Sequence, residues 1–188
     1  MSKVQVNYVL NVLYLCTTKL INKMIMIKPN HKRTILVGKA ASGKDHLRKR
    51  YESRGFKYAV SYTTRPPREG EVDGKDYIFI SEEDAKDLVN KGFFYEYVMF
   101  NGWLYGTSVE QFYSDDLFIM TPAGISHIKP EDRMNSFIIY TDIEMSIRMT
   151  RLANRNMPGD SMERRIKADE LDFAEFTDYD LRITNPDF

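Results

Sequence analysis

The sequence predicts an α/β protein in which a parallel sheet, flanked by helices, carries an inserted subdomain of mixed β structure. Two observations predict the sheet. Short apolar runs alternate with helix-like segments at both ends of the region from Arg33 onward, and a Gly-rich turn at residues 38–44 joins the first run to the first helix. A third observation predicts the insert, because the middle of this region, about residues 58–106, is rich in strand-like segments.

The elements follow in order along the chain. The first apolar run ends at Gly38 and is unbroken, as expected of a strand buried on both faces. Gly55 ends the first helix, and Ser81 to Asp84 has the spacing of a capping box that opens another helix, which Gly92 closes. The expected strands are 34–37, 58–62, 77–80, 93–99, 117–120, 137–140 and 181–184, and the expected helices are 43–54, 81–92, 143–154 and 163–176.

Composition restricts the class of protein. A chain of 188 residues, 43% of them hydrophobic and 13% aromatic, can build one compact core. The 27 basic residues equal the 27 acidic ones, and a formal charge of zero argues against a protein that coats nucleic acid. The single cysteine, Cys16, excludes an internal disulfide and fits a reducing compartment, so we expect a cytoplasmic protein.

Residues 1–32 are predicted to be a poorly ordered extension ahead of the domain at 33–188. A short apolar stretch follows Lys3, as in a signal peptide, but polar residues interrupt it and no small-residue cleavage site follows. The stretch is also too short to span a bilayer. We therefore expect neither secretion nor a membrane partner.

The turn at residues 38–44 matches the phosphate-binding motif G-x-x-x-x-G-K and lies between a predicted strand and a predicted helix. Glycines let backbone N–H groups turn towards phosphate oxygens, the helix N-terminus adds partial positive charge, and Lys44 can reach the β and γ phosphates. A Gly-Lys turn that arose by chance would not need to lie between a strand and a helix. The predicted ATP-binding residues are Gly38, Lys39, Ala40, Ala41, Ser42, Gly43, Lys44 and Asp45.

Position 45 departs from the general motif, which has Ser or Thr there to bind Mg²⁺. Asp45 could hold the metal through a water molecule, although its charge also repels the phosphates. We expect Mg²⁺ as the cofactor that accompanies ATP, and we name no residue of the chain as its direct ligand.

Two further runs carry a family resemblance. The run at 61–77, S-Y-T-T-R-P-P-R-E-G-E-V-D-G-K-D-Y, resembles the guanylate kinase signature, and so does the run from Glu96 to Thr107. The resemblance extends from Thr34 to the end of the chain. It implies a P-loop kinase core with a nucleoside-monophosphate-binding insert at about 61–106 and a short lid at about 151–166.

Four side chains of these two runs are suited to a phosphate. Arg65 and Arg68 present two planar forks that can each grip a phosphate bidentately, and Tyr77 and Tyr105 can donate phenolic hydrogen bonds. The resemblance implies that these four and Ser61 hold the acceptor's monophosphate. Taken singly, the arginines could equally lie on a solvated loop, and the tyrosines could be ordinary strand aromatics.

The resemblance implies that Glu96 and Thr107 contact the base. A carboxylate that accepts from the N1–H and amino group of guanine rejects adenine, which has no N1–H. By itself, Glu96 could equally be a strand residue that faces solvent. The family carries an acidic base contact where this chain has Thr121. Because a hydroxyl is a neutral and weaker acceptor, the base preference stays open.

Basic residues recur along the predicted helix at 143–154. Arg148, Arg151 and Arg155 fall at i, i+3 and i+7 and so share one face. They could form an exposed basic stripe, with Glu144 and Arg148 as an i,i+4 pair. Alternatively, they belong to a flap that closes over the phosphates, excludes water and neutralises charge on the moving phosphoryl group.

The resemblance selects among these cations. It implies that Arg151, Arg155 and Arg165 act in the lid alongside Lys44 in catalysis. Arg164 is a near alternative to its neighbour. Asn185 matches a family asparagine near the adenine of ATP, although a turn residue would also suit its place.

The function that the resemblance implies is transfer of the γ-phosphoryl group of ATP to GMP or dGMP, giving ADP and GDP or dGDP. The partners are then small nucleotides, and the protein is a monomer or a homodimer. The alternatives are a kinase for another (d)NMP and an inactive guanylate-kinase-like module that binds a protein. Such modules tend to lose the phosphate loop, and this chain keeps Gly38, Gly43 and Lys44.

Overall fold

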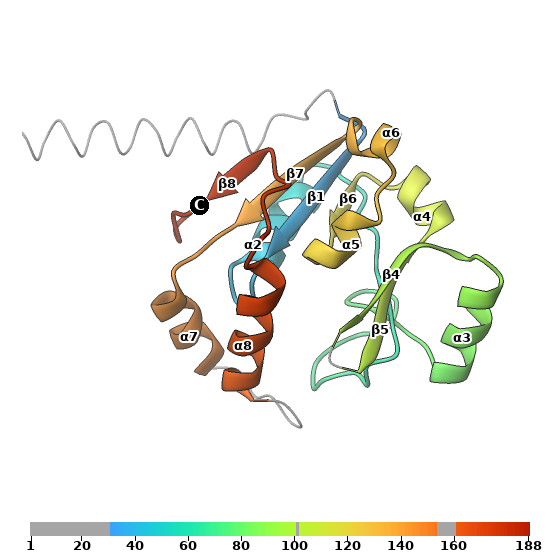
Figure 1. Cartoon of the computed structure of the whole chain (residues 1–188), viewed down its shortest axis with the longest axis horizontal. Helices are drawn as coiled ribbons and strands as arrows, with labels where there is room; N and C mark the ends of the chain where they lie inside the picture. The colour runs from blue at the N-terminus through green and yellow to red at the C-terminus, as the bar shows by residue number, and fades with distance from the viewer. Residues whose placement is uncertain (1–30, 101, 154–160) are drawn as a thin grey trace, which may run out of the picture. The chain divides into compact units, whose positions relative to one another are not determined.

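The structure is a computed structural model that describes residues 31–100, 102–153 and 161–188 (Figure 1). Residues 31–186 form one compact unit, and the fold given below is that of this unit. Of the predicted extension, only the last two residues lie in the described part of the chain. Within the described ranges, none of the helices has both the length and the apolar character needed to span a bilayer.

A four-stranded parallel sheet forms the centre of this unit. Its strand order is β6-β1-β7-β8, so the first strand lies between two strands that come much later in the chain (Figure 1). Every residue of β1 is buried, as expected of a central strand in a parallel sheet. Ile35 and Val37 join Phe118 and Ile138 in the main hydrophobic cluster. The strands are β1 (Arg33–Gly38), β6 (Leu117–Ile119), β7 (Ser136–Thr141) and β8 (Leu181–Ile183).

A second sheet, of order β3-β2-β5-β4, is mixed. Strands β2 and β3 pair in parallel, whereas β5 pairs with both β2 and β4 in antiparallel fashion. The ring of Tyr62 packs edge-on against Phe93 and Phe94, which gives this small sheet its own aromatic packing. The strands are β2 (Tyr62–Thr63), β3 (Ile78–Phe79), β4 (Phe94–Phe100) and β5 (Trp103–Ser108). The predicted fold, a parallel core with a mixed β insert, is confirmed.

The helices connect and cover these sheets. Ser81 begins one of them as predicted, because its hydroxyl accepts from the Asp84 N–H. Helix α2 packs against β1 and β6, and α5 packs against β4 and α8. The helices are α2 (Lys44–Glu52), α3 (Glu82–Asn90), α4 (Val109–Ser114), α5 (Pro122–Ser126), α6 (Pro130–Arg133), α7 (Met145–Ala153) and α8 (Met162–Phe173).

Two details of the expected elements are wrong. The strand expected at 58–62 is reduced to the start of β2 and an isolated bridge from Tyr58 to Leu117. Helices α4, α5 and α6 were not expected, because four to six residues are too few to show a helical period. The residues that cap α4 and α5 could nevertheless have indicated these two helices. Ser108 forms a full capping box with Gln111, and Thr121 caps a helix with proline at its first position.

Candidate nucleotide-binding site

The phosphate loop connects the end of β1 to the start of α2, in the setting that the sequence predicts. Two of its residues, Ala41 and Gly43, have positive φ angles of 59° and 101°, so the backbone reverses its curvature twice. The ammonium group of Lys44 lies over the loop and donates to the carbonyls of Gly38 at 2.5 Å and Lys39 at 3.1 Å. The Lys44 side chain is therefore held against the loop that the sequence predicts to bind phosphate.

Close packing against β7 fixes the start of this loop. A methyl group added to Gly38 would clash with the Thr141 hydroxyl, so this position accepts only glycine. The buried hydroxyls of Ser42 and Thr141 lie 2.7 Å apart in a hydrogen bond, and Thr141 also donates to the Val37 carbonyl. Ser42 thus ties the loop to the sheet with its side chain.

Arg151 contacts the loop from α7. Its guanidinium donates to the Ala41 carbonyl at 3.1 Å and to the Pro186 carbonyl at 3.2 Å. This second contact brings it next to Asn185, the predicted adenine contact. Arg155, the other predicted lid residue of this segment, lies outside the described residues.

Arg148 does not belong to an exposed basic stripe, and its guanidinium pairs with carboxylates other than that of Glu144. Its side chain is 1% exposed and forms ion pairs with Asp169 and Glu170 of α8. A stripe at i, i+3 and i+7 was one of the two interpretations of the sequence, and it fails here because the first member is buried.

Arginines and tyrosines of the insert come together as the sequence predicts. The buried guanidinium of Arg65 lies 5.2 Å from the ring centre of Tyr77, and the Tyr77 and Tyr105 rings are 5.9 Å apart. Arg65 donates to the Glu71 carboxylate at 2.8 Å, and the backbone N–H of Arg68 donates to the other oxygen of that carboxylate at 2.7 Å. The fifth predicted member, Ser61, lies just before β2, where its carbonyl accepts from the Ile78 N–H.

Charges from three parts of the chain meet at this cluster. The pKa of Arg68 is lowered, first by burial and then by the nearby charges of Arg165 and Arg65. Burial and the neighbouring Tyr105 raise the pKa of Tyr77 to about 12, and the Asp45 carboxylate adds to this increase. Asp45 directly follows the phosphate loop, and Arg165 lies in the part of α8 that overlaps the predicted lid, so charges from both segments reach the cluster of the insert.

The predicted base contacts, Glu96 and Thr107, form a second and more buried part of the candidate site. Glu96 is 6% exposed, and its Oε1 accepts from the Thr107 hydroxyl at 2.8 Å. Its other oxygen faces α5, because a methyl group added to Gly124 would lie only 2.9 Å from Oε2. The Thr121 hydroxyl accepts from the Gly124 N–H at 3.1 Å and so caps α5. The Thr121 hydroxyl oxygen therefore accepts a hydrogen bond within α5, and the hydroxyl proton can still be donated to another acceptor.

Comparison with known proteins decides the family. Residues 30–188 match the family model described as guanylate kinase. The chain belongs to the guanylate kinase family. It is 38% identical over 169 residues to the guanylate kinase of Legionella pneumophila (strain Lens), covering 82% of this chain and 78% of that one. It is 31% identical over 164 residues to the guanylate kinase of Sus scrofa, covering 80% and 83% respectively.

A solved structure agrees with the fold. The crystal structure of guanylate kinase from Anaplasma phagocytophilum superimposes with a TM-score of 0.63, at 20% identity, over 83% of this chain and 78% of that chain. At this identity the similarity concerns the fold alone. The parallel core and the separate mixed sheet are thus those of a guanylate kinase.

Sequence reasoning missed two residues of the candidate site, Glu71 and Gly124. Burial alone would raise the pKa of Glu71, but hydrogen bonds from Arg65 and Arg68 lower it overall. Glu71 is thus an internal partner for the two arginines that are predicted to bind phosphate, and its place three residues after Arg68 was the available signal. Gly124 had no such signal, because only the fold brings α5 against β4.

Replacing Gly124 with alanine is expected to disturb base recognition selectively. The added methyl group would displace the Glu96 carboxylate, the far end of a flexible side chain, so the fold should persist. We expect the KM for GMP to rise about tenfold with little change in the KM for ATP, since a displaced carboxylate loses a charged hydrogen bond. Ser126→Ala, at an exposed position of α5, is the control. Equal changes in both KM values would contradict the assignment of Glu96 to the base.

Glu96→Gln is expected to remove a pH-dependent loss of stability. Burial raises the pKa of Glu96 from 4.5 to about 7, against the opposing hydrogen bonds from Thr107. The folded chain therefore keeps a proton that the unfolded chain has lost, and stability falls as pH rises between these two values. Above this range the glutamine variant should be more stable than the native chain by up to about 3 kcal/mol. Urea unfolding across this range measures it, and a difference independent of pH would contradict it.

Proposed function

We propose that the chain transfers the γ-phosphoryl group of ATP to GMP or dGMP, giving ADP and GDP or dGDP. The observation that supports this most strongly is that a member of the guanylate kinase family carries two clusters suited to anions, the phosphate loop and the Arg65–Arg68–Tyr77–Tyr105 group, with the charge of Asp45 at the end of the loop reaching Tyr77 of the second. One cluster suits a polyphosphate and the other a single phosphate.

The donor side rests on the loop and Lys44. The N-terminus of α2 favours an anion, and the Lys44 ammonium can exchange its two loop carbonyls for phosphate oxygens. Arg151 approaches from the other side and adds positive charge next to the loop. We assign Lys44, Arg151, Arg155 and Arg165 to neutralising the charge that develops on the transferring phosphoryl group.

The proposed acceptor site contains arginine side chains whose charges lie close enough to affect one another. Burial and the nearby charges of Arg165 and Arg65 lower the pKa of Arg68, so like charges approach one another here, and the Glu71 carboxylate pairs with both Arg65 and Arg68. A phosphate dianion placed there relieves the repulsion. One of its oxygens attacks the γ phosphorus as ADP leaves, so a P–O bond forms as another breaks and no proton has to move.

Asp45 is the group next to the phosphate loop that we assign to Mg²⁺. The Asp45 carboxylate is 68% exposed, lies in the first turn of α2, and is 3.7 Å from the Arg48 guanidinium. No group of three potential metal ligands occurs in the described ranges. This fits Mg²⁺, which binds through one or two carboxylates, water and substrate phosphates rather than an all-protein cage. Asp45 would hold it from the protein side, and the ion would supply neutralisation of the phosphate charge.

Glu96 supports guanine as the preferred base. An ionised Glu96 can accept from the N1–H and amino group, and Thr107 holds its first oxygen in place. The Thr121 hydroxyl, which caps α5, replaces the acidic residue expected from the family pattern. We therefore propose GMP and dGMP as the preferred acceptors, with a narrower margin over other purine monophosphates than two carboxylates would give.

The test is ADP release in a coupled assay with each common NMP and dNMP, Mg²⁺ and ATP, measured against the acceptor-free rate. GMP or dGMP should give the fastest turnover. Turnover only with another monophosphate would move the proposal to that kinase, and no turnover with any would favour a protein-binding module. We further propose a cytoplasmic monomer or homodimer without a nucleic-acid partner, which size-exclusion chromatography with and without added oligonucleotide tests.

A further inference from the structure

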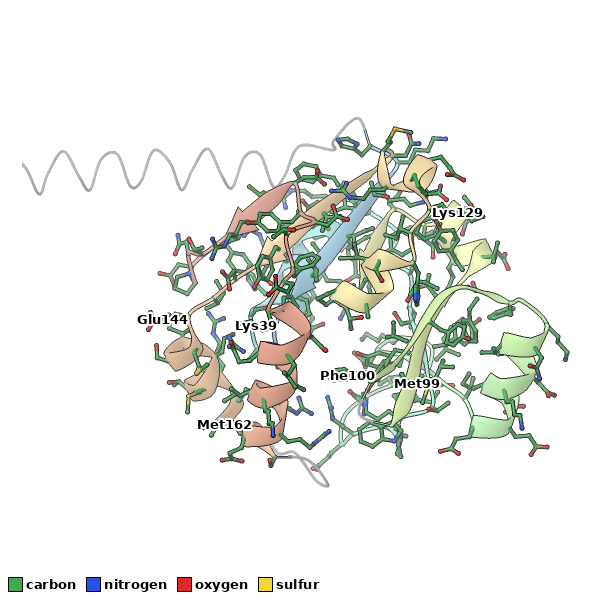
Figure 2. All side chains as sticks on the ribbon, viewed as in Figure 1. Lys39, Met99, Phe100, Lys129, Glu144 and Met162 are labelled. Carbon is green, nitrogen blue, oxygen red and sulfur yellow. The ribbon has the colours of Figure 1, made fainter. Side chains whose placement is uncertain are left out.

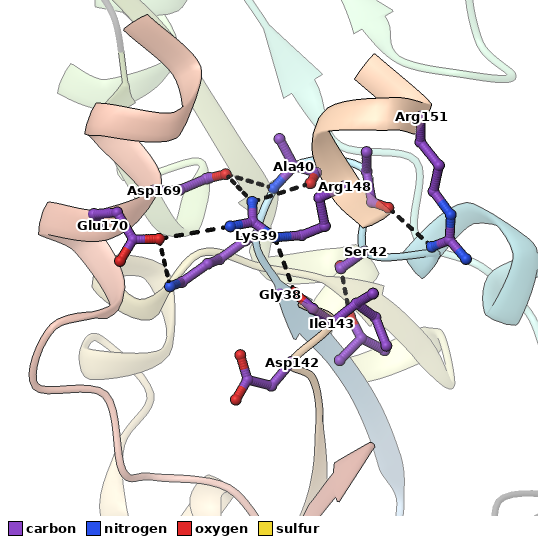
Figure 3. Close-up of polar contacts among 12 residues, drawn as sticks. Gly38, Lys39, Ala40, Ser42, Asp142, Ile143, Arg148, Arg151, Asp169 and Glu170 are labelled. Atoms are coloured by element: carbon purple, nitrogen blue, oxygen red, sulfur yellow. Dashed lines mark hydrogen bonds and ion pairs between the residues drawn. The ribbon is translucent and has the colours of Figure 1, made fainter. Parts of the chain in front are cut away.

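Helix α8 places two carboxylates on the phosphate loop (Figure 3). The Oδ2 atom of Asp169 accepts from the backbone N–H of Ala40 at 2.8 Å. The Oε1 atom of Glu170 accepts from the ammonium group of Lys39, also at 2.8 Å. Figure 2 shows Lys39 beside this helix. An amide and a cation of the loop are therefore already bound to an anion, and the anion belongs to the protein.

Arg148 holds both carboxylates in place from α7. Its Nη1 lies 3.0 Å from the Asp169 Oδ2 atom, and its Nη2 lies 3.5 Å from the Glu170 Oε1 atom. The remaining guanidinium nitrogen, Nε, donates to the Ile143 carbonyl at 3.0 Å. Arg148 is thus held by three contacts. Asp169 Oδ2 is shared between Arg148 and the Ala40 N–H, and Glu170 Oε1 is shared between Arg148 and Lys39.

These contacts resemble those that a bound phosphate makes. A phosphate loop recognises oxyanions through backbone N–H groups and lysine side chains, which are the groups that Asp169 and Glu170 engage. Asp169 is largely buried in this arrangement. Burial raises its pKa, while the Ala40 N–H and the charges of Lys44 and Arg148 oppose that increase.

We propose that Asp169 and Glu170 form an internal anion of the phosphate loop, which occupies the loop until the polyphosphate of the donor displaces it. The proposal rests on the function proposed above. A donor polyphosphate in the loop would lie close to two carboxylates of like charge, and this repulsion is strong where water is excluded. Donor binding must therefore break the contacts of α8 with Ala40 and Lys39.

This exchange would couple the donor to the lid. Arg165 precedes Asp169 by four residues, so the two lie on the same face of α8, one turn apart. A displacement of Asp169 from the loop therefore moves the segment that carries Arg165, whose charge already reaches Arg68 in the acceptor cluster. The internal anion thus holds α8, whose first residues overlap the predicted lid, in its nucleotide-free position.

The test is the affinity for ATP, measured by titration calorimetry, in Glu170→Gln and Asp169→Asn. We expect ATP to bind about threefold more tightly to the first variant and about tenfold more tightly to the second, because each loses a competing charge, the first at a more solvated position. The affinity for GMP should change less than the affinity for ATP, because neither carboxylate contacts the acceptor cluster in the part of the chain that the structure describes. Glu170 is 46% exposed, so its variant will fold even if Asp169→Asn weakens the packing around Arg148.

Asp172→Asn is the matched control, since it removes one charge from the same helix. In the part of the chain that the structure describes, no hydrogen bond or ion pair joins Asp172 to the loop, and its ATP affinity should stay within about twofold of the native value. ATP binding no tighter in both test variants than in the native chain would overturn the proposal and make α8 a structural brace. A native chain that binds no ATP would instead overturn the proposed function, and this inference with it.

Discussion

Lys44→Ala is expected to lower kcat by about a thousandfold, with the fold intact. The Lys44 ammonium lies over the phosphate loop, bonded to the carbonyls of Gly38 and Lys39, and it is the cation that the motif places against the β and γ phosphates. Losing one preorganised charge where negative charge develops costs about a hundredfold to a thousandfold in rate in comparable cases. Lys44 packs on the loop and not in the core, so the melting temperature should change little.

The measurement is ADP release at saturating ATP and GMP, together with a thermal melt followed by circular dichroism. Lys49→Ala, an exposed lysine of the same helix, is the matched control and should keep the native rate. A native rate in Lys44→Ala would show that the donor's phosphates bind elsewhere.

Arg65→Ala is expected to raise the KM for GMP by about a hundredfold, with a smaller effect on the KM for ATP, because a bidentate charged contact to phosphate is lost. The structure fixes this guanidinium strongly: it is buried, stacked near the ring of Tyr77 and bonded to Glu71. Arg65→Lys should recover little of the affinity, since an ammonium group cannot present a planar fork.

Removal of Arg65 also leaves the Glu71 carboxylate without its closest cation. The unpaired carboxylate would itself repel the phosphate. The double variant Arg65→Ala/Glu71→Gln separates the two effects, because it removes both charges. Arg54→Ala, an exposed arginine outside the cluster, is the control. If KM for ATP rose and KM for GMP did not, Arg65 would belong to the donor site and the assignment of the two clusters would be wrong.

Much of the fold could be predicted because buried parallel strands are continuous apolar runs. The runs ending near Gly38, Met120 and Tyr140 became β1, β6 and β7, within one or two residues. The sequence failed where an element is too short to show a period, as in α5, or where pairing depends on a distant partner, as at Tyr58. Such elements exist because of the surrounding fold and not because of their own pattern.

The candidate site divides in the same way. Arg65, Tyr77 and Tyr105 could be grouped from the sequence because they belong to specific runs, and the structure brings them together. Arg148 could not be placed, because spacing alone gives the same helix face whether that face meets water or protein. Its partner Asp169 lies 21 residues further on, beyond any local pattern.

The central claim is that a phosphoryl group passes directly from a nucleotide in the phosphate loop to one held by Arg65 and Arg68. Incubation with GMP and ATP labelled in its γ-phosphate, followed by separation of the products, tests it most directly. The account predicts label in the β-phosphate of GDP, formed in step with ADP. Label found only in free phosphate, or left in ATP while GMP stays unchanged, would contradict it.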